Sequence, residues 1–318
     1  MNITTLCAIK PHFMKTFRFI VLAIVAFGFT LPPAPLKMQY TFKVGDQYTW
    51  QQDTKQTIKQ SVMGMEQVVD NLYSGSFQLK VTELTASGAK IEAQYTRIKN
   101  ATKSPMGETV MDSEGSQETT ENKVFKALTN KAFFIFMDKR GQIEKMEGVD
   151  NLWSGLGEVG LDEATQNAMK QSLQQFMSES ALKSSFEQVF ITYPDKSVAK
   201  GDAWSQSAEM PLNMNVKNTW SVAEMSATTA DLTGDGIYST ADTEKTMDLP
   251  GGLKAKTSLS GKQAMKSKID VKSGWPTKMD VLSELKGTMT LLAGGMIPED
   301  MDVPMEIVSE TTYTITKK

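Results

Sequence analysis

The chain has 318 residues, of which 40% are hydrophobic and 22% charged, a composition typical of a globular protein with enough apolar surface for a core. Its formal net charge of −3 is too small to indicate a nucleic acid or an anionic membrane surface as a partner. The length fits two domains or one large β domain.

The N-terminal segment has the pattern of a secretory signal peptide. Lys15 and Arg18 precede an uncharged apolar run, Phe19–Leu31, which is shorter than the roughly 20 residues that span a bilayer. We predict a signal peptide that starts at Met14, within a leader of residues 1–35; an uncleaved single-pass anchor is the alternative. No cysteine follows the run, so the pattern is not that of a lipobox lipoprotein. We therefore expect export to the periplasm or the medium, with no transmembrane span after cleavage.

The single cysteine, Cys7, and the single histidine, His12, both precede the apolar run, so the mature chain would contain neither. Without them there is no Ser-His-Asp or Cys-His nucleophile, no His- or Cys-ligated zinc and no disulfide. The sequence also has no Walker A loop and no dinucleotide fingerprint. We predict a non-catalytic protein without a cofactor. Hydrolysis by a pair of carboxylates is the remaining enzymatic alternative, since it needs only Asp and Glu.

Short segments in which apolar and polar residues alternate dominate the rest of the chain. This period of two is typical of strands with one buried face. The predicted strands are Tyr40–Val44, Ser76–Val81, Lys90–Tyr95 and Val308–Ile315. The Ser87-Gly88 pair predicts a hairpin turn between the second and the third of them.

Residues 161–190 have a helical pattern instead, with little Gly or Pro. Asp162 fits an N-cap, Ser178–Ser180 predict a kink or a second cap, and Pro194 ends the segment. We predict a connecting helix, within residues 156–192, that docks on the sheet; a partner-binding amphipathic helix is the alternative. The two apolar stripes consist of Met169, Leu173 and Phe176, and of Leu182, Phe186 and Val189.

The stretches before and after this helix resemble each other. Lys43–Tyr48 matches Ala199–Trp204, each with a Gly-Asp turn before an aromatic residue. Later in each stretch, Asp138–Gly141 is echoed by Asp270–Gly274. Matches in the same order suggest a duplicated β unit of roughly 120 residues.

The predicted fold is therefore mainly β, of the α+β class. It consists of two related, curved antiparallel β units, residues 36–155 and 193–318, bridged by the helical segment.

Residues 231–242 fit a twelve-residue calcium loop imperfectly. Oxygen ligands would come from the first, third, fifth, ninth and twelfth positions, and the required glycine, Gly236, stands at the sixth. A Gly-Asp-Gly hairpin turn is the alternative interpretation. The five candidate ligands are Asp231, Thr233, Asp235, Ser239 and Asp242.

Methionine is abundant, with 21 residues, and late in the chain it clusters at Met296, Met301 and Met305. Its flexible side chain suits a site that accepts varied apolar shapes. We predict that these three residues line a cavity for an apolar or amphipathic ligand such as a lipid. Thioether coordination of Cu(I) is the alternative.

Three blocks of the sequence, Phe133–Leu152, Phe186–Trp204 and Ile269–Pro276, carry a resemblance to a known family. They resemble an exported bacterial family known from Bacteroidetes, domain of unknown function 6263. The resemblance implies export and supplies no activity, cofactor or catalytic residue. A looser likeness to the curved half-barrels of periplasmic lipoprotein carriers implies a sheet that wraps helices over an apolar cavity.

Three functions remain, in order of preference. The first is a non-catalytic envelope protein that binds an apolar or amphipathic ligand, which requires an apolar cavity of at least about 300 Å³. The second is a structural or protein-interaction module in which that space is filled. The third is a carboxylate-dependent hydrolase, which requires two inward carboxylates about 5–10 Å apart across a cleft.

Overall fold

The computed structural model describes residues 35–210, 212–249, 252–294 and 297–318, leaving aside the side chains of residues 172, 175 and 176. The strands of the first half are β1 (Gln47–Val62), β2 (Met65–Leu84), β3 (Gly88–Ser104), β4 (Gly107–Asp112), β5 (Phe133–Asp138) and β6 (Ile143–Glu147). Those of the second half are β7 (Ala203–Met210), β8 (Met214–Met225), β9 (Thr229–Thr240), β10 (Met247–Asp248), β11 (Lys254–Asp270), β12 (Pro276–Leu291) and β13 (Met301–Lys317).

In the sequence, one helix lies between β4 and β5, and the other helical segments lie between β6 and β7. They are α1 (Thr120–Leu128), the 3₁₀ segment η1 (Val149–Val159), α2 (Glu163–Met177) and α3 (Glu179–Val189). The prediction of a mainly β fold with a helical segment in the middle of the chain is confirmed.

All strands of the described residues form one antiparallel sheet in the order β6-β5-β3-β2-β1-β13-β12-β11-β9-β8-β7, with β4 paired to β3 and β10 to β11. The two halves of the chain join at the centre, where β1 pairs with β13 from Tyr48↔Lys317 to Gln60↔Met305. The predicted units are therefore not separate sheets, because backbone hydrogen bonds continue from one half into the other.

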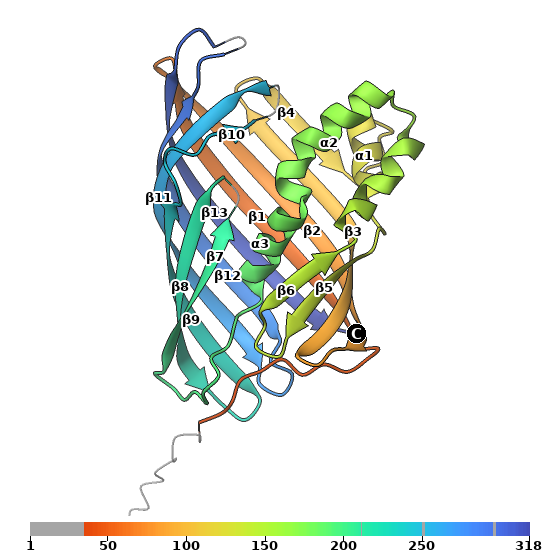
Figure 1. Cartoon of the computed structure of the whole chain (residues 1–318), viewed down its shortest axis with the longest axis vertical. Helices are drawn as coiled ribbons and strands as arrows, with labels where there is room; N and C mark the ends of the chain where they lie inside the picture. Colours follow the sequence, from red (N-terminus) through yellow and green to blue (C-terminus); the bar gives the residue numbers. More distant parts are fainter. Residues whose placement is uncertain (1–34, 211, 250–251, 295–296) are drawn as a thin grey trace, which may run out of the picture. The chain divides into compact units, whose positions relative to one another are not determined.

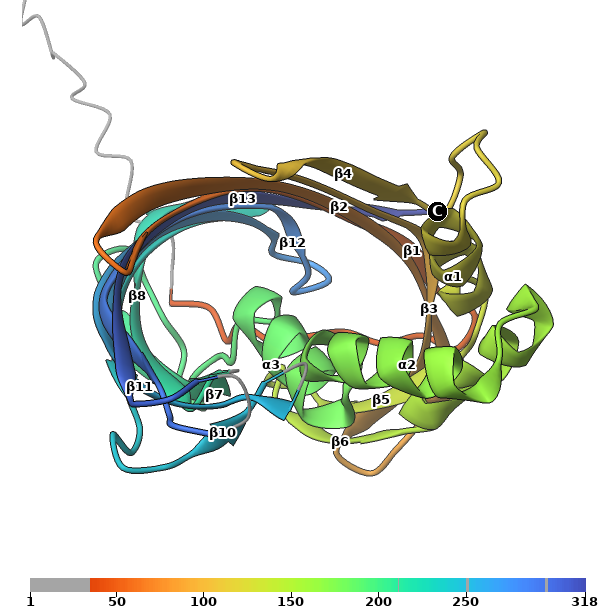
Figure 2. The ribbon, with the colours of Figure 1, turned by 90° about the horizontal axis from the view of Figure 1, so that it is seen from above.

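The sheet is strongly curved, and the helices lie on its inner side (Figures 1 and 2). Helix α3 packs against both edge strands, β6 and β7. A hydrogen bond joins α3 to β7, since Gln206 Nε2 donates to the carbonyl of Glu187 at 3.0 Å. Just after the helix, Trp204 Nε1 of β7 donates to the carbonyl of Thr192 at 2.8 Å. The helical segment thus closes the open side of the sheet.

The helix signals are confirmed in detail. Asp162 caps α2, and its Oδ1 accepts a hydrogen bond from the backbone N–H of Thr165 at 3.0 Å. Ser178 ends α2 and caps α3 through Ala181. The stripe of Leu182, Phe186 and Val189 is buried. Both caps satisfy backbone donors that a helix end would otherwise leave unpaired.

Three of the four predicted strands are confirmed, since they lie within β2, β3 and β13. The fourth, Tyr40–Val44, is wrong. Its backbone is held by two different turns rather than by one ladder: the N–H of Tyr40 donates to the carbonyl of Lys139, and that of Thr41 donates to the carbonyl of Ser273. Alternation alone does not distinguish such a crossing segment from a strand.

The repeated Gly-Asp pairs form the same turn in both halves. Gly45 N–H donates to the carbonyl of Val81, and Val81 N–H donates to the carbonyl of Asp46. In the second half, Gly201 and Asp202 make the same two bonds with Val222. Both glycines have φ near +90°, a conformation that favours glycine.

Candidate functional site

Every second side chain of β1 points to the inner face of the sheet. Trp50 on this face stands opposite Phe77 of β2, which stands opposite Tyr95 of β3. These three rings are buried together with Phe186 of α3. The helices therefore cover the same face that carries the aromatic rows.

A cavity of about 430 Å³ lies between this face and the helices. Its lining comes from β1, β2, β3, α1, α2 and α3, and one side is aromatic and aliphatic while the other carries amides and hydroxyls. The lining residues are Trp50, Gln52, Thr54, Gln56, Asn71, Tyr73, Phe77, Tyr95, Ile98, Asn100, Phe125, Met177, Ala181, Ser185 and Phe186.

The apolar side is a packed group of rings. The centroids of Phe77 and Tyr95 are 4.0 Å apart, those of Trp50 and Phe186 are 4.6 Å apart, and those of Trp50 and Phe77 are 5.1 Å apart. The indole N–H of Trp50 is buried and has no hydrogen-bond partner among the described residues. The buried indole N–H groups of Trp220 and Trp275, which do not line this cavity, have no such partner either.

The polar side is a ladder of neutral side chains across four strands. Asn100 Nδ2 donates to Thr102 Oγ1 at 3.4 Å, and Thr102 Oγ1 donates to Asn71 Oδ1 at 2.8 Å. Asn71 Nδ2 then donates to Gln56 Oε1 at 3.3 Å, and Gln56 Nε2 donates to Ser309 Oγ at 3.1 Å. The ladder fixes these amides while leaving each with unused donors or acceptors.

Tyr73 lies between the two sides. Its phenol occupies the space over Gly75, where an added Cβ would stand 2.6 Å from the Tyr73 hydroxyl oxygen. Burial raises the pKa of Tyr73 to about 12, although its contact with the Tyr95 hydroxyl acts in the opposite direction. The cavity thus presents a neutral phenol at physiological pH.

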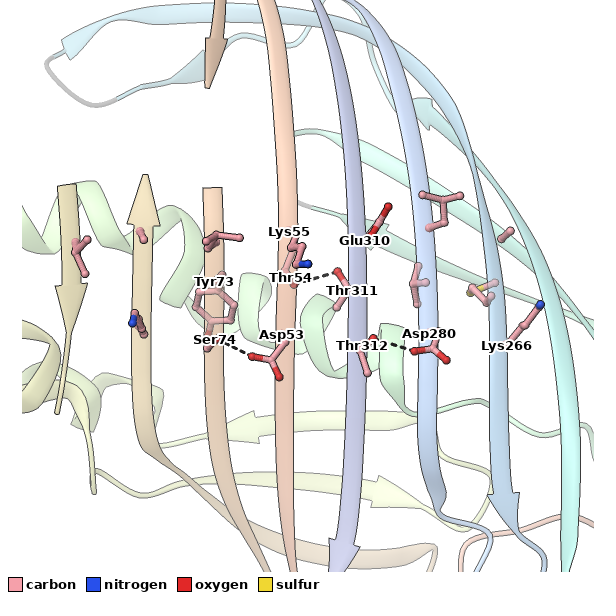
Figure 3. A pocket seen from close by; sticks show the side chains of 18 of the residues that line it. Asp53, Thr54, Lys55, Tyr73, Ser74, Lys266, Asp280, Glu310, Thr311 and Thr312 are labelled. Carbon is pink, nitrogen blue, oxygen red and sulfur yellow. Dashed lines mark hydrogen bonds between the residues drawn. The ribbon is translucent and has the colours of Figure 1, made fainter. Parts of the chain in front are cut away.

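The outer face carries a second, more open groove of about 1000 Å³ (Figure 3). The strand register aligns Ser74, Asp53, Thr312 and Asp280 in one row across β2, β1, β13 and β12. Ser74 Oγ donates to Asp53 Oδ1 at 2.6 Å, and Thr312 Oγ1 donates to Asp280 Oδ1 at 2.8 Å. The adjacent row on the same face is apolar on β2, β3 and β4, with Leu72, Ala101 and Val110, and continues into Lys55 of β1 and Glu310 of β13.

This outer row contains two carboxylates at the separation that a hydrolase would need, but the pKa of one of them is shifted in the wrong direction for a general acid. Asp53 and Asp280 are two strand spacings apart, or about 10 Å at roughly 4.8 Å per spacing. The pKa of Asp280 is lowered, first by a hydrogen bond from Lys278 and also by the hydroxyl of Thr312. A general acid needs a raised pKa. The inner cavity has no carboxylate among its described lining residues.

The calcium-loop prediction is wrong, and so is its hairpin alternative. Asp231, Thr233, Asp235 and Ser239 all lie within strand β9, on its outer face, and Asp242 follows the strand. Residues two apart on a strand are roughly 6.6 Å apart, so their oxygens do not converge on one ion. No cluster of three metal-ligating side chains occurs in the described part of the chain.

The glycines of this segment have a packing role. A Cβ on Gly234 would stand 2.8 Å from the ring of Trp220, and one on Gly236 would stand 2.3 Å from Asn218 Oδ1. The side chains of Trp220 and Asn218 therefore lie directly over the β9 backbone.

The predicted methionine lining is not brought together at the inner cavity. Met305 packs against a separate apolar cluster of Met214, Val216, Tyr238 and Leu259. Met301 is half-buried at the start of β13, and neither residue is among those that line the cavity. Met296 lies outside the described residues.

The polar residues of the cavity were missed by the sequence analysis. Gln56, Asn71 and Asn100 lie on three different strands, and only the strand register places them in neighbouring positions. The signal that could have found them is the polar residue at inward positions of otherwise alternating strands, such as Gln52 and Thr54 after Tyr48 and Trp50.

No helix within the described ranges is long and apolar enough to cross a membrane.

Comparison with known proteins identifies a family but no activity. A family model described as "Family of unknown function (DUF6263)" matches residues 86–276. No curated protein matches the chain.

Solved structures show only distant likeness. The structure "Lipid-protein interactions in lipovitellin" aligns with a TM-score of 0.46 and 8% identity. The alignment covers 87% of this chain but only 25% of the lipovitellin chain. An outer membrane channel from Pseudomonas putida F1 aligns with a TM-score of 0.26 and 8% identity over 87% of this chain and 97% of its own. At these scores neither bears on what this chain binds.

Proposed function

This chain belongs to the family of unknown function DUF6263, and we propose that it binds a small amphipathic or apolar ligand in the inner cavity without catalysing a reaction. The observation that carries the proposal is the cavity itself. Its volume of about 430 Å³ exceeds the roughly 300 Å³ at which ligand pockets begin, and its lining combines buried rings with a few placed polar groups.

The chemistry of the lining supports binding rather than turnover. Its reactive oxygens are the hydroxyls of Thr54, Tyr73, Tyr95 and Ser185, and none of the described lining residues is a histidine, cysteine or carboxylate that could act as their base. The apolar rings would hold a hydrocarbon part, and the amide ladder would hold a polar end.

A protein-interaction module is the second candidate, and the outer groove favours it. Leu72 and Val110 are 52% and 47% exposed there, beside the charged row of Asp53 and Asp280. An apolar strip next to fixed charges is a common feature of protein-binding surfaces.

The proposal is tested with a fluorescent apolar probe, N-phenyl-1-naphthylamine. Ala181 lines the cavity, so Ala181→Phe fills part of it and should weaken probe binding at least about tenfold, which is 1.4 kcal/mol. The matched control is Ala264→Phe on the outer face. Met177→Trp is a second cavity-filling variant if Ala181→Phe does not fold. Equal binding by the wild type and a folded cavity-filling variant would overturn the proposal.

We also propose that the protein is exported. The basic residues Lys15 and Arg18 before the run Phe19–Leu31 support this. Mass spectrometry of protein from the periplasm or medium should show a mature N-terminus between Thr30 and Met38. A cytoplasmic protein that retains Cys7 would contradict it.

The duplication of residues 36–155 and 193–318 also stays a proposal. The equivalent Gly-Asp turns support it, as do the turns at Asp138 and Asp270. In each of these, the aspartate Oδ1 accepts a backbone N–H two residues later, from Arg140 in one half and from Lys272 in the other.

A further inference from the structure

We propose that the polar side of the inner cavity selects a ligand with an uncharged head group that both donates and accepts hydrogen bonds, such as a hydroxylated or amide-bearing one, and rejects ionised ligands. The proposal rests on the proposed binding function and names the chemical class of the ligand.

The first observation is the absence of charge. Among the fifteen described residues that line the cavity, none is Asp, Glu, Lys, Arg or His. This follows from the alternation of the strands, because the nearest charged residues of β1 and β2, which are Asp53, Lys55 and Asp70, occupy the outward positions. Asp70 accepts a hydrogen bond from Thr57 on that outer side, at 2.7 Å.

The second observation is the capacity of the amide ladder. Asn71 and Gln56 each use one N–H within the ladder, at 3.3 and 3.1 Å, and a primary amide has two. Each amide oxygen also has two lone pairs, and the ladder uses at most one of them on Asn71 and Gln56. The wall therefore offers donors and acceptors side by side, which matches hydroxyl and amide groups.

The energetics favour the neutral class. A carboxylate, phosphate or ammonium group that entered this cavity would lose its water without gaining a counter-ion, at a cost of several kcal/mol. A hydroxyl or amide exchanges its hydrogen bonds with water for bonds with the ladder at little net cost.

The volume restricts the size of the ligand. At about 430 Å³ it lies near the lower end of the roughly 300–1,000 Å³ of ligand pockets. This favours one hydrocarbon chain with a small head group over a lipid with two chains.

The test compares three ligands with the same hydrocarbon chain: monodecanoylglycerol, decanoate and decylamine. Each is titrated against wild-type protein that holds N-phenyl-1-naphthylamine, at neutral pH and below micelle-forming concentrations. We expect monodecanoylglycerol to bind at least about tenfold more tightly than either ion. Equally tight binding of decanoate or decylamine would overturn the selectivity and leave the binding function intact. If the probe binds but none of the three displaces it, the head-group proposal fails alone; if nothing binds, both proposals fail.

A substitution in the ladder makes the test more specific. Gln56→Lys introduces a cation into the wall and should shift the preference toward decanoate by at least about tenfold. The matched control is Gln51→Lys on the exposed outer face of the same strand, which should leave the preference unchanged. A folded Gln56→Lys variant with the wild-type preference would overturn the assigned role of the ladder. If that variant does not fold, the comparison of the three ligands on the wild-type protein decides.

Discussion

The indole of Trp50 on β1 and the phenyl ring of Phe186 on α3 meet edge to face, with centroids 4.6 Å apart and planes at 80°. Phe186 is also 5.3 Å from Phe77 of β2 and 6.0 Å from Phe133 of β5. A single side chain thus attaches the helix to three strands. The same contact forms the apolar side of the cavity, so the stability of the fold and the shape of the site depend on it together.

Replacing this ring should be costly. Phe186 is fully buried, and Phe186→Ala should lower the free energy of unfolding by about 3–5 kcal/mol, measured by urea denaturation. Phe186→Leu keeps most of the volume and should cost less than half as much. A loss of under about 1 kcal/mol for the alanine variant would mean that α3 is not anchored at this point.

A second prediction concerns Gly236 of β9. An alanine there would bring its Cβ within 2.3 Å of Asn218 Oδ1 and 2.6 Å of Gln263 Cγ, both buried side chains. We expect Gly236→Ala to destabilise the protein by about 1–3 kcal/mol in thermal or urea unfolding, as overpacked cores do. Gly157→Ala is the control, because no atom lies within 4 Å of its added Cβ. Equal stabilities of the two variants would contradict the close approach.

These glycines show where sequence reasoning fails on this protein. Gly-Asp-Gly at residues 234–236 has the composition of a turn or of a calcium loop, yet it lies in the middle of a strand. The reason is tertiary: Trp220 and Asn218 of the neighbouring strand need the space that a side chain would fill. Neither neighbour is visible from the local pattern, so local chemistry predicted the wrong element.

Signals that act within a few residues were reliable by contrast. Asp162 and Ser178 cap the two helices as predicted, because a cap depends only on backbone donors three residues away. Alternation located three of the four strands that it predicted, since each buries one face. The candidate site could not be predicted from the sequence, because Gln56, Asn71 and Asn100 become neighbours only through the register of three strands.

The corrected position of the candidate calcium ligands gives a third prediction. Asp231, Thr233 and Asp235 lie in succession along one face of an extended strand and cannot surround a single ion. Neither added calcium nor EDTA should shift the thermal unfolding midpoint of the protein, as measured by differential scanning fluorimetry. A stabilisation by calcium that is lost in Asp235→Asn would restore the loop interpretation.

The last prediction concerns Glu187 on α3, the helix that packs against both edge strands. Burial raises the pKa of Glu187 on α3, and the nearby charge of Glu209 on β7 acts in the same direction. Lys183, whose Nζ lies 3.8 Å from Glu187 Oε1, acts in the opposite direction. The folded protein therefore holds a proton on Glu187 at pH values at which the unfolded chain has released it.

The sign of the pH dependence follows from this. The stabilising contribution of protonated Glu187 is complete below the pKa of an unfolded glutamate, about 4.3, and is lost as the pH rises through the higher value of the folded state. Glu187→Gln removes this loss, so the variant should be more stable than the wild type at pH 7, with the difference shrinking toward pH 4. Urea midpoints measured across this range check it, with the exposed Glu66→Gln as the control substitution. A glutamine variant less stable than the wild type at pH 7 would show instead that the ion pair with Lys183 outweighs the cost of burial.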